Sequence, residues 1–257
     1  MLEICVAGAT GWTGSAVVQG VVDADDLALR SAVARSAAGR EVGGAPVFGK
    51  VREALDGVDV LIDYTSHLVV KDNVLAAIEH GVATVVGTSG LSADDYAEID
   101  SAARERGVGV VAAGNFSLTA AMAQAAALLA ARHLPHWEII DYAGATKPDV
   151  PSGTARELAE RLAEVRRPVL GRSLADTDGP REARGATVGG AQIHSVRLPS
   201  FVVSTEVVFA LPDERLSIRH DAGGSPAPYV AGTLLAARAV TGTVGLTRGL
   251  DSLLLAR

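Results

Sequence analysis

Lys147 is the residue of this chain whose surroundings most clearly suggest chemistry. Only three of the 23 basic residues are lysines, and this one lies in the run Thr146-Lys147-Pro148-Asp149-Val150-Pro151-Ser152-Gly153-Thr154-Ala155. The two prolines restrict the loop, and Ser152 or Thr154 can cap the helix that follows. A helix start with exposed amides and hydroxyls attracts a carboxylate, and the ammonium supplies the opposite charge. The run therefore predicts a carboxylate site, although a well-capped surface helix explains it equally well.

Three glycines near the beginning of the chain have the spacing of a nucleotide-binding turn. Gly8, Gly11 and Gly14 lie between an apolar run at 2–7 and a helical stretch that reaches Val22. Glycines at this point let the backbone approach a pyrophosphate, and the amides of the helix start hold its charge. The alternative is an ordinary strand, turn and helix without a ligand. Because the motif opens a strand–helix–strand unit, we favour dinucleotide binding.

The end of the second expected strand indicates which dinucleotide would bind. Many such sites place an acid there, which pairs with the ribose hydroxyls, whereas a 2′-phosphate prefers arginine. This chain has Ala34-Arg35-Ser36 at that point. The sequence therefore favours NADPH over NADH, unless Arg35 is only a solvated loop charge.

The elements that would position these residues alternate in the first half of the chain. Short strands without internal charge are separated by helices, which predicts a parallel sheet covered on both faces. Glycine and hydroxyl clusters follow the strands, at the edge where such sheets bind ligands. We expect strands at 2–7, 27–34, 58–62, 82–86 and 108–113, with helices reaching residue 22 and at 69–80 and 92–106.

The second half has a different pattern, with consecutive strands that predict a mixed or antiparallel sheet. A stretch at 166–190, rich in charges and containing two prolines, is expected to be irregular and exposed. The last helix is assigned back to the first lobe. We expect helices at 119–132, 155–165 and 229–239, and strands at 137–141, 191–198, 202–211 and 215–220.

Composition excludes several classes of protein. The chain has 257 residues, 48% hydrophobic and 21% charged, with a net charge of −7 and no basic stretch, so a nucleic-acid partner is not expected. The single Cys5 excludes an internal disulfide and suits a reducing cytoplasm, and no export signal is visible. The 25 uncharged residues between Arg106 and Arg132 include glycines and polar side chains, so we expect no membrane span. His133 and His136 are interpreted as surface residues rather than metal ligands, and Lys50 and Lys71 as ordinary surface charges.

Five motifs in order resemble the dihydrodipicolinate reductase family of bacterial lysine biosynthesis. They are GATGWTG at the first turn, DYTS, GTSG and GNFSL after later strands, and KPDVPSGTA. IHSVRLPS and the closing helix are also similar. The resemblance implies a Rossmann-type dinucleotide-binding lobe (1–117), a mixed α/β substrate-binding and tetramerisation lobe (118–221), and a tail (222–257) that returns to the first lobe. It also implies a cytoplasmic homotetramer that transfers hydride from NADPH or NADH to a cyclic imine carboxylate.

The resemblance also assigns residues to roles. Lys147 is the expected catalytic residue, because a cation beside the ring nitrogen stabilises charge that grows there. The substrate would be held by Lys147, Ser152, Gly153 and Thr154. The cofactor would be held by Gly8, Thr10, Gly11, Trp12, Thr13, Gly14, Arg35, Ser36, Thr65, Gly87, Thr88, Asn115 and Phe116.

The chain departs from the family at the expected proton donor. Family members carry two adjacent histidines ahead of the lysine, where this chain has Ala143 and Gly144, and neither can move a proton. Loss of a general acid costs about 10²–10⁴ in rate. An arginine expected near the last helix is also replaced, in a stretch that contains Pro226 and Pro228.

Three explanations of this departure stay open. Lys147, Tyr142 or water could donate the proton, or the substrate could be a preformed iminium or another cyclic imino acid. The chain could also be a non-catalytic, NADPH-binding regulatory relative. Two other enzyme classes fit less well. A short-chain dehydrogenase needs tyrosine four residues before lysine, not five, and a semialdehyde dehydrogenase needs a cysteine far beyond Cys5.

Overall fold

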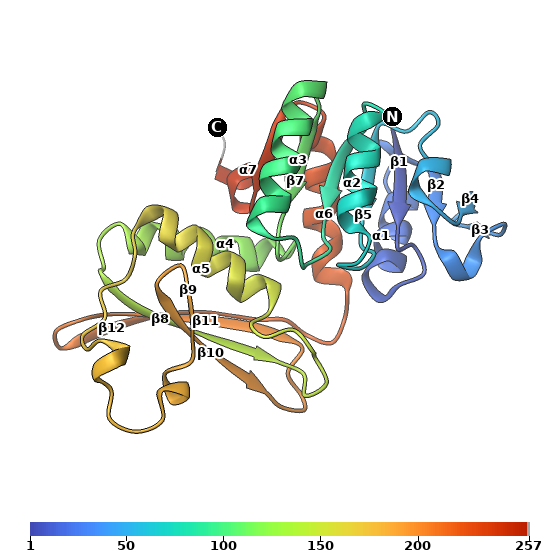
Figure 1. Ribbon diagram of the computed structural model, residues 1–257. Coiled ribbons are helices and arrows are strands. Elements are labelled where there is room, and N and C mark those ends of the chain that lie inside the picture. The colour runs from blue at the N-terminus through green and yellow to red at the C-terminus, as the bar shows by residue number, and fades with distance from the viewer. Residues whose placement is uncertain (256–257) are drawn as a thin grey trace. The chain divides into compact units, whose positions relative to one another are not determined.

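Eight strands form one sheet around the glycine motif, in the order β13-β7-β6-β5-β1-β2-β4-β3. The structure is a computed structural model that describes residues 1–255 (Figure 1). All neighbouring strands are parallel except β3, which runs antiparallel to β4. The strands are β1 Leu2–Ala7, β2 Leu27–Val33, β3 Glu41–Val42, β4 Ala45–Phe48, β5 Val60–Asp63, β6 Ala83–Val86, β7 Gly109–Ala112 and β13 Gly245–Arg248.

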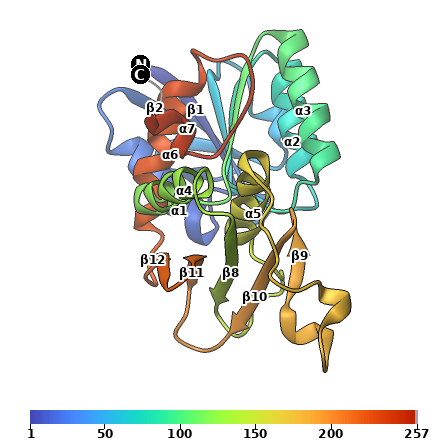
Figure 2. The same ribbon diagram turned by 90° about the vertical axis from the view of Figure 1, so that its left-hand side faces the viewer.

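Helices cover both faces of this sheet, which explains why its central strands contain so few charges. Figure 2 shows α1 and α6 on one face and α2 and α3 on the other. Every residue of β5, β6 and β7 is buried. The helices are α1 Trp12–Val22, α2 Val70–Glu79, α3 Ala93–Arg106, α6 Ala227–Val240 and α7 Asp251–Leu255, with short 3₁₀ turns η1 Arg35–Ala37 and η2 Val51–Glu53.

The start of α3 confirms the local signal read from the sequence. The Ser92 hydroxyl accepts a hydrogen bond from the Asp95 backbone N–H at 3.1 Å, and the Asp95 carboxylate accepts from the Ser92 N–H at 2.8 Å. This reciprocal pair satisfies amides that a helix start otherwise leaves without partners. The helix ends at Gly107, whose φ of +72° suits the left-handed cap that glycine adopts without strain.

A second unit, Thr119–Ser225, contains a mixed five-stranded sheet in the order β12-β11-β8-β10-β9. Strands β8 and β10 are parallel, and the other pairs are antiparallel, as the run of consecutive strands predicts. Helices α4 and α5 lie on one face of this sheet (Figure 1). The elements are α4 Leu118–Ala131, β8 His136–Ala143, α5 Gly153–Val165, η3 Leu174–Asp176, η4 Arg181–Arg184, β9 Ala186–Val188, β10 Ala191–Arg197, β11 Val203–Leu211 and β12 Glu214–Asp221.

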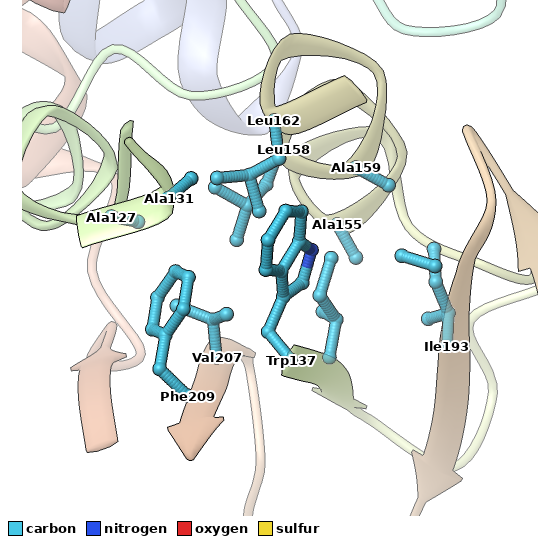
Figure 3. Close-up of a cluster of buried hydrophobic side chains, with 12 residues drawn as sticks. Ala127, Ala131, Trp137, Ala155, Leu158, Ala159, Leu162, Ile193, Val207 and Phe209 are labelled. Atoms are coloured by element: carbon cyan, nitrogen blue, oxygen red, sulfur yellow. The ribbon is translucent and has the colours of Figure 1, made fainter. Parts of the chain in front are cut away.

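The core of the second unit lies between its sheet and these helices. Burial alternates strictly along β8, so that Trp137, Ile139, Asp141 and Ala143 are buried. Trp137 packs against Phe209 of β11 with 5.5 Å between ring centroids, below side chains of α4 and α5 (Figure 3). Residues of the other set, such as Glu138 and Tyr142, therefore face the opposite side of the sheet.

The sequence did not predict four short elements, β3, β4, β13 and α7, and 166–190 contains η3, η4 and β9 as well as irregular chain. Strands β3 and β4 have two and four residues and include Pro46, so no alternation of side chains marks them. We expected unit boundaries after residues 117 and 221, and the chain divides after Leu118 and Ser225. The segment from Pro226 onward returns to the first unit. Among the described helices, none has the length and apolarity needed to cross a bilayer.

A hydrogen-bonded tyrosine ties helix α6 to the first sheet. The half-buried Tyr64 has its hydroxyl 2.7 Å from Thr233 Oγ1, which itself donates to the Tyr229 carbonyl at 2.7 Å, so the tyrosine is the donor. Burial raises the pKa of Tyr64. One turn of α6 also passes so close to the Phe116 carbonyl that a Cβ on Gly232 would overlap it. The returning segment is therefore built into the first unit.

We predict that Thr233→Val destabilises the protein. The variant keeps the shape of the buried Thr233 side chain but leaves the Tyr64 hydroxyl without its acceptor, which costs about 1–3 kcal/mol in the free energy of unfolding. Urea denaturation measures this loss. Thr241→Val, at an exposed threonine at the end of the same helix, is the control and should change stability by less than about 0.5 kcal/mol. Equal losses in both variants would contradict the tether.

Candidate functional site

The glycine turn after β1 is shaped by close backbone packing. Gly8 has a φ of +82°, and a Cβ there would overlap the Tyr64 carbonyl oxygen. A Cβ on Gly14 would overlap the Gly8 carbonyl, so the turn and the start of α1 lie in contact. Gly11 is the N-cap of α1, and no side chain caps the first-turn amides of this helix. These amides are suited to an anion such as a pyrophosphate.

A cavity of about 920 Å³ opens at this edge of the sheet. Its volume is that of a site for a sizeable organic ligand, so the cavity and the glycine turn together fit a dinucleotide. Several expected cofactor residues line it, namely Gly8, Thr10, Gly11, Arg35, Ser36 and Thr65. The structure adds residues that the sequence did not suggest. Among them is Lys50, which we had interpreted as an ordinary surface charge.

Asp63 organises the loops that follow β5 and β6. This carboxylate is 0% exposed and accepts hydrogen bonds from Thr65 N–H at 3.0 Å, Thr65 Oγ1 at 2.7 Å, Asn73 Nδ2 at 2.9 Å and Thr88 Oγ1 at 2.7 Å. Thr65 and Thr88 thus donate their hydroxyls to Asp63.

The remaining expected cofactor residues have visible packing roles. A Cβ on Gly87 would overlap the ring of Tyr64, and Phe116 meets the same ring edge-on at 6.2 Å between centroids. The Asn115 side-chain oxygen accepts from the Ser117 N–H at 2.8 Å and shapes the turn after β7. Trp12 and Thr13 lie with Gly14 in the first turn of α1, where the Trp12 ring meets Tyr229 at 6.0 Å. These contacts leave the role of each residue toward a cofactor as a prediction.

In the second unit, Lys147 lies on the loop between β8 and α5. Its ammonium forms an ion pair with Asp149 Oδ1 at 2.8 Å, and its side chain is 29% exposed. The Lys147 N–H donates to the Gly144 carbonyl at 3.0 Å, which forms a tight turn directly after the strand. An ammonium has three donors, so the pair with Asp149 leaves capacity for a second anion.

Ser152 is buried, and its hydroxyl already has two partners. It donates to Asp141 Oδ1 at 2.7 Å and, as the N-cap of α5, accepts from the Ala155 N–H at 3.3 Å. Its backbone N–H also donates to Asp141 Oδ2 at 2.9 Å. Of the expected substrate residues, Gly153 and Thr154 occupy the first two helical positions, where amides suit a carboxylate.

A network centred on Asp141 holds this helix start. The carboxylate is 0% exposed and also accepts from Ser195 Oγ at 3.0 Å and Arg197 Nη2 at 2.8 Å. Arg197 reaches on to the Asp149 carbonyl at 2.8 Å, which ties the lysine loop to β10. Burial alone would raise the pKa of Asp141, but hydrogen bonds from Ser152 and Arg197 outweigh it and hold the pKa below its ordinary value. Sequence reasoning missed Asp141 and Arg197, although an acid at the buried end of an apolar strand is a usable signal for the first of them.

The two positions at which the family carries histidines are tightly packed in this chain. Ala143 is fully buried, and a Cβ on Gly144 would lie 3.2 Å from the Phe201 carbonyl oxygen. Tyr142 faces the other side of the sheet, where its hydroxyl donates to Glu206 at 3.2 Å and its ring stacks on Phe201. Because strand residues alternate, Tyr142 points away from the buried Asp141 and Ser152. This geometry argues against Tyr142 as the proton donor.

No group of three or more metal-ligating side chains occurs in the part of the chain that the structure describes. His136, one of the two close histidines, lies with its Nδ1 2.7 Å from the Val169 carbonyl.

Comparison with known proteins agrees with this geometry over the whole chain. The family model described as dihydrodipicolinate reductase, N-terminus, matches residues 2–116, and the model described as dihydrodipicolinate reductase, C-terminus, matches residues 114–254. The chain belongs to the dihydrodipicolinate reductase family. This membership confirms the resemblance drawn from the five motifs.

Relatives of this family are similar along their full length. The 4-hydroxy-tetrahydrodipicolinate reductase of Thermosynechococcus vestitus is 36% identical, with 98% of this chain and 97% of that protein covered. The enzyme of the same name from Moorella thermoacetica is 37% identical, with 98% of each covered. Among solved structures, dipicolinate-bound dihydrodipicolinate reductase from Paenisporosarcina sp. TG-14 has a TM-score of 0.78 and 26% identity, over 98% of this chain and 99% of that one.

We predict that Asp141 makes folding stability depend on acid pH. Its folded pKa is lowered, so its contribution is fully present above the ordinary aspartate value of about 3.9 and is lost as pH falls through the folded pKa. Asp141→Asn should lower the free energy of unfolding by about 3–5 kcal/mol at neutral pH, because Arg197 loses its buried partner. The difference from wild type should shrink below about pH 4.

Urea denaturation between pH 3 and 7 tests this dependence. Asp178→Asn, at a fully exposed aspartate, is the matched control and should leave the pH profile unchanged. A constant difference between wild type and Asp141→Asn across the whole range would contradict the prediction.

Proposed function

We propose that this protein uses NADPH, with NADH as a weaker alternative, to reduce a cyclic imine that carries carboxylate groups. The observation that carries the proposal is the start of α5, where Lys147 and the first turn of the helix are held by a buried network. The first unit supports it with the glycine turn and the cavity of about 920 Å³. Relatives named 4-hydroxy-tetrahydrodipicolinate reductase support this choice of substrate class.

The residues of the first unit bind and orient the nucleotide in this proposal. Backbone amides at Gly11 and in the first turn of α1 hold the pyrophosphate, and the loops that Asp63 braces shape the cavity beside it. When bound, the dinucleotide supplies the hydride.

The residues of the second unit bind the anionic ring. Lys147 attracts a ring carboxylate, and the amides of Gly153 and Thr154 add the partial positive charge of a helix start. Ser152 acts indirectly, because its hydroxyl joins the helix to Asp141. The network thus positions the charged groups before substrate arrives, which reduces the cost of ordering them.

The proton for the ring nitrogen has two sources within this proposal, Lys147 and water. A second candidate function follows from the closed positions at Ala143 and Gly144: the substrate is a preformed cyclic iminium that needs no proton. The absence of a proton-donating side chain at Ala143 and Gly144 favours this candidate, because an iminium accepts hydride without protonation of its nitrogen. A non-catalytic NADPH-binding relative is the outcome left if no imine is reduced.

We also propose that the protein is a cytoplasmic homotetramer. Helices α4 and α5 pack on one face of the second sheet. The other face, which carries Glu138, Ile140 and Val208, borders a cavity of about 510 Å³. Sedimentation velocity measures the assembly.

The single cysteine bears on the compartment. Burial in the first sheet raises the pKa of the Cys5 thiol to about 12, which suits an unreactive thiol in a reducing compartment.

A steady-state screen tests the proposed reaction. Purified protein is mixed with NADPH or NADH and with dihydrodipicolinate, other cyclic imino carboxylates, or a preformed cyclic iminium, and absorbance at the nicotinamide band is followed. We expect oxidation of NADPH with at least one ring. Faster turnover of the iminium than of the neutral imines would select the second candidate. Tight NADPH binding without turnover of any ring would remove the proposed activity.

We predict that Lys147→Ala raises KM far more than it lowers kcat. A charge-assisted bond to a carboxylate contributes about 1.5–3 kcal/mol, which corresponds to a rise of roughly 10–150-fold. Lys71→Ala is the control, because that lysine pairs with Asp95 and Glu98 in the first unit and should leave both constants unchanged. A fall in kcat at unchanged KM would instead identify Lys147 as the proton donor.

A further inference from the structure

Strand β4 brings Lys50 beside Arg35. Strands β2 and β4 are parallel neighbours, with Val33 paired to Phe48, and the Ala34 N–H donates to the Phe48 carbonyl at 3.0 Å. Arg35 and Lys50 each follow these paired residues by two positions, so both leave the sheet at its carboxyl edge. Neighbouring strands are about 4.8 Å apart, which places the two loops side by side.

The loops that carry these two cations are also in contact. A Cβ built on Gly49 would lie 3.8 Å from the Cβ of Ala38, an ordinary van der Waals distance. Lys50 is the N-cap of η2 and has extended backbone, and its carbonyl accepts from the Glu53 N–H at 3.3 Å. Backbone bonds therefore hold both loops at the same corner of the cavity.

The charges at this corner are unevenly paired. Arg35, Lys50 and Arg52 all line the cavity, and Arg52 is held by Glu79 at 2.6 Å. Within residues 1–255, no ion pair is found for Arg35 or Lys50. Asp72 is the one acid among the lining residues. Two cations for which the described residues supply no ion pair thus line the cavity, together with Ser36.

We propose that Lys50 and Arg35 together bind the 2′-phosphate of an adenine dinucleotide and that Lys50 sets the preference for NADPH over NADH. This inference rests on the proposed function for its nucleotide. The planar guanidinium of Arg35 can bind two phosphate oxygens, and the ammonium of Lys50 adds a point charge. A ribose hydroxyl in place of the phosphate would leave both cations unpaired.

Calorimetric titration with two fragments of the cofactor tests the role of Lys50. Adenosine 2′,5′-bisphosphate and 5′-AMP differ by the 2′-phosphate alone, so their affinity ratio isolates that group. We expect wild type to favour the bisphosphate and Lys50→Ala to lose about five- to tenfold of that preference, with 5′-AMP unchanged. Lys50→Arg should retain most of the preference, and Lys71→Ala, at a lysine paired with Asp95 and Glu98, should retain all of it.

Two results would overturn the inference. Equal weakening of both fragments in Lys50→Ala would place the lysine on a shared group, and unchanged affinities would remove it from the site. Because Lys50 is exposed, circular dichroism should show Lys50→Ala folded as wild type. The titration does not depend on catalysis: selective NADPH binding through Lys50 without reduction of any imine would end the proposed activity and keep this inference.

Discussion

In each unit, a buried carboxylate near the end of a strand organises the candidate binding residues. Removing a charge from water is costly unless hydrogen bonds replace the lost solvent. Asp63, at the end of β5, receives four bonds from neutral donors, and Asp141, near the end of β8, receives its bonds from two serines and an arginine. In each case the donors come from several segments of the chain, so satisfying one charge fixes those segments together.

The two carboxylates differ in a way that matters for the chemistry beside them. Asp63 has only neutral donors, which come from the loops after β5 and β6 and from α2. Asp141 is partly neutralised by Arg197, which also reaches the Asp149 carbonyl and so connects strand β10 to the lysine loop. An anionic ring would therefore meet the cation of Lys147 without strong repulsion from the acid that supports α5. Asp141 and its partners hold the start of α5, whereas Lys147 supplies the positive charge beside it.

Local signals explain what the sequence predicted well. The glycine turn, the cap of α3 and the alternation of strands with helices depend on residues close in the chain, and the structure reproduces them. The sequence did not indicate the partnership of Asp141 with Arg197, because 56 residues separate them and only the pairing of β8 with β10 brings them together. The position of Lys50 at the cavity was missed for a related reason. Its value as a cavity residue depends on β4, a four-residue strand with no pattern of its own.

The three lysines show why the partner of a cation decides its role better than its neighbours in sequence do. Lys71 is held by two carboxylates, Asp95 and Glu98, and this explains it as a surface charge. Lys147 has one partner, Asp149, which orients the ammonium and leaves donors for a substrate. Lys50 has no carboxylate partner within the described residues and faces a cavity with a second such cation. An ammonium without a protein anion, held at the edge of a nucleotide-sized cavity, gains most from a ligand that brings its own charge. Phosphate on the ribose is the part of NADPH that NADH lacks, and it is the one group that would distinguish the two cofactors at this corner.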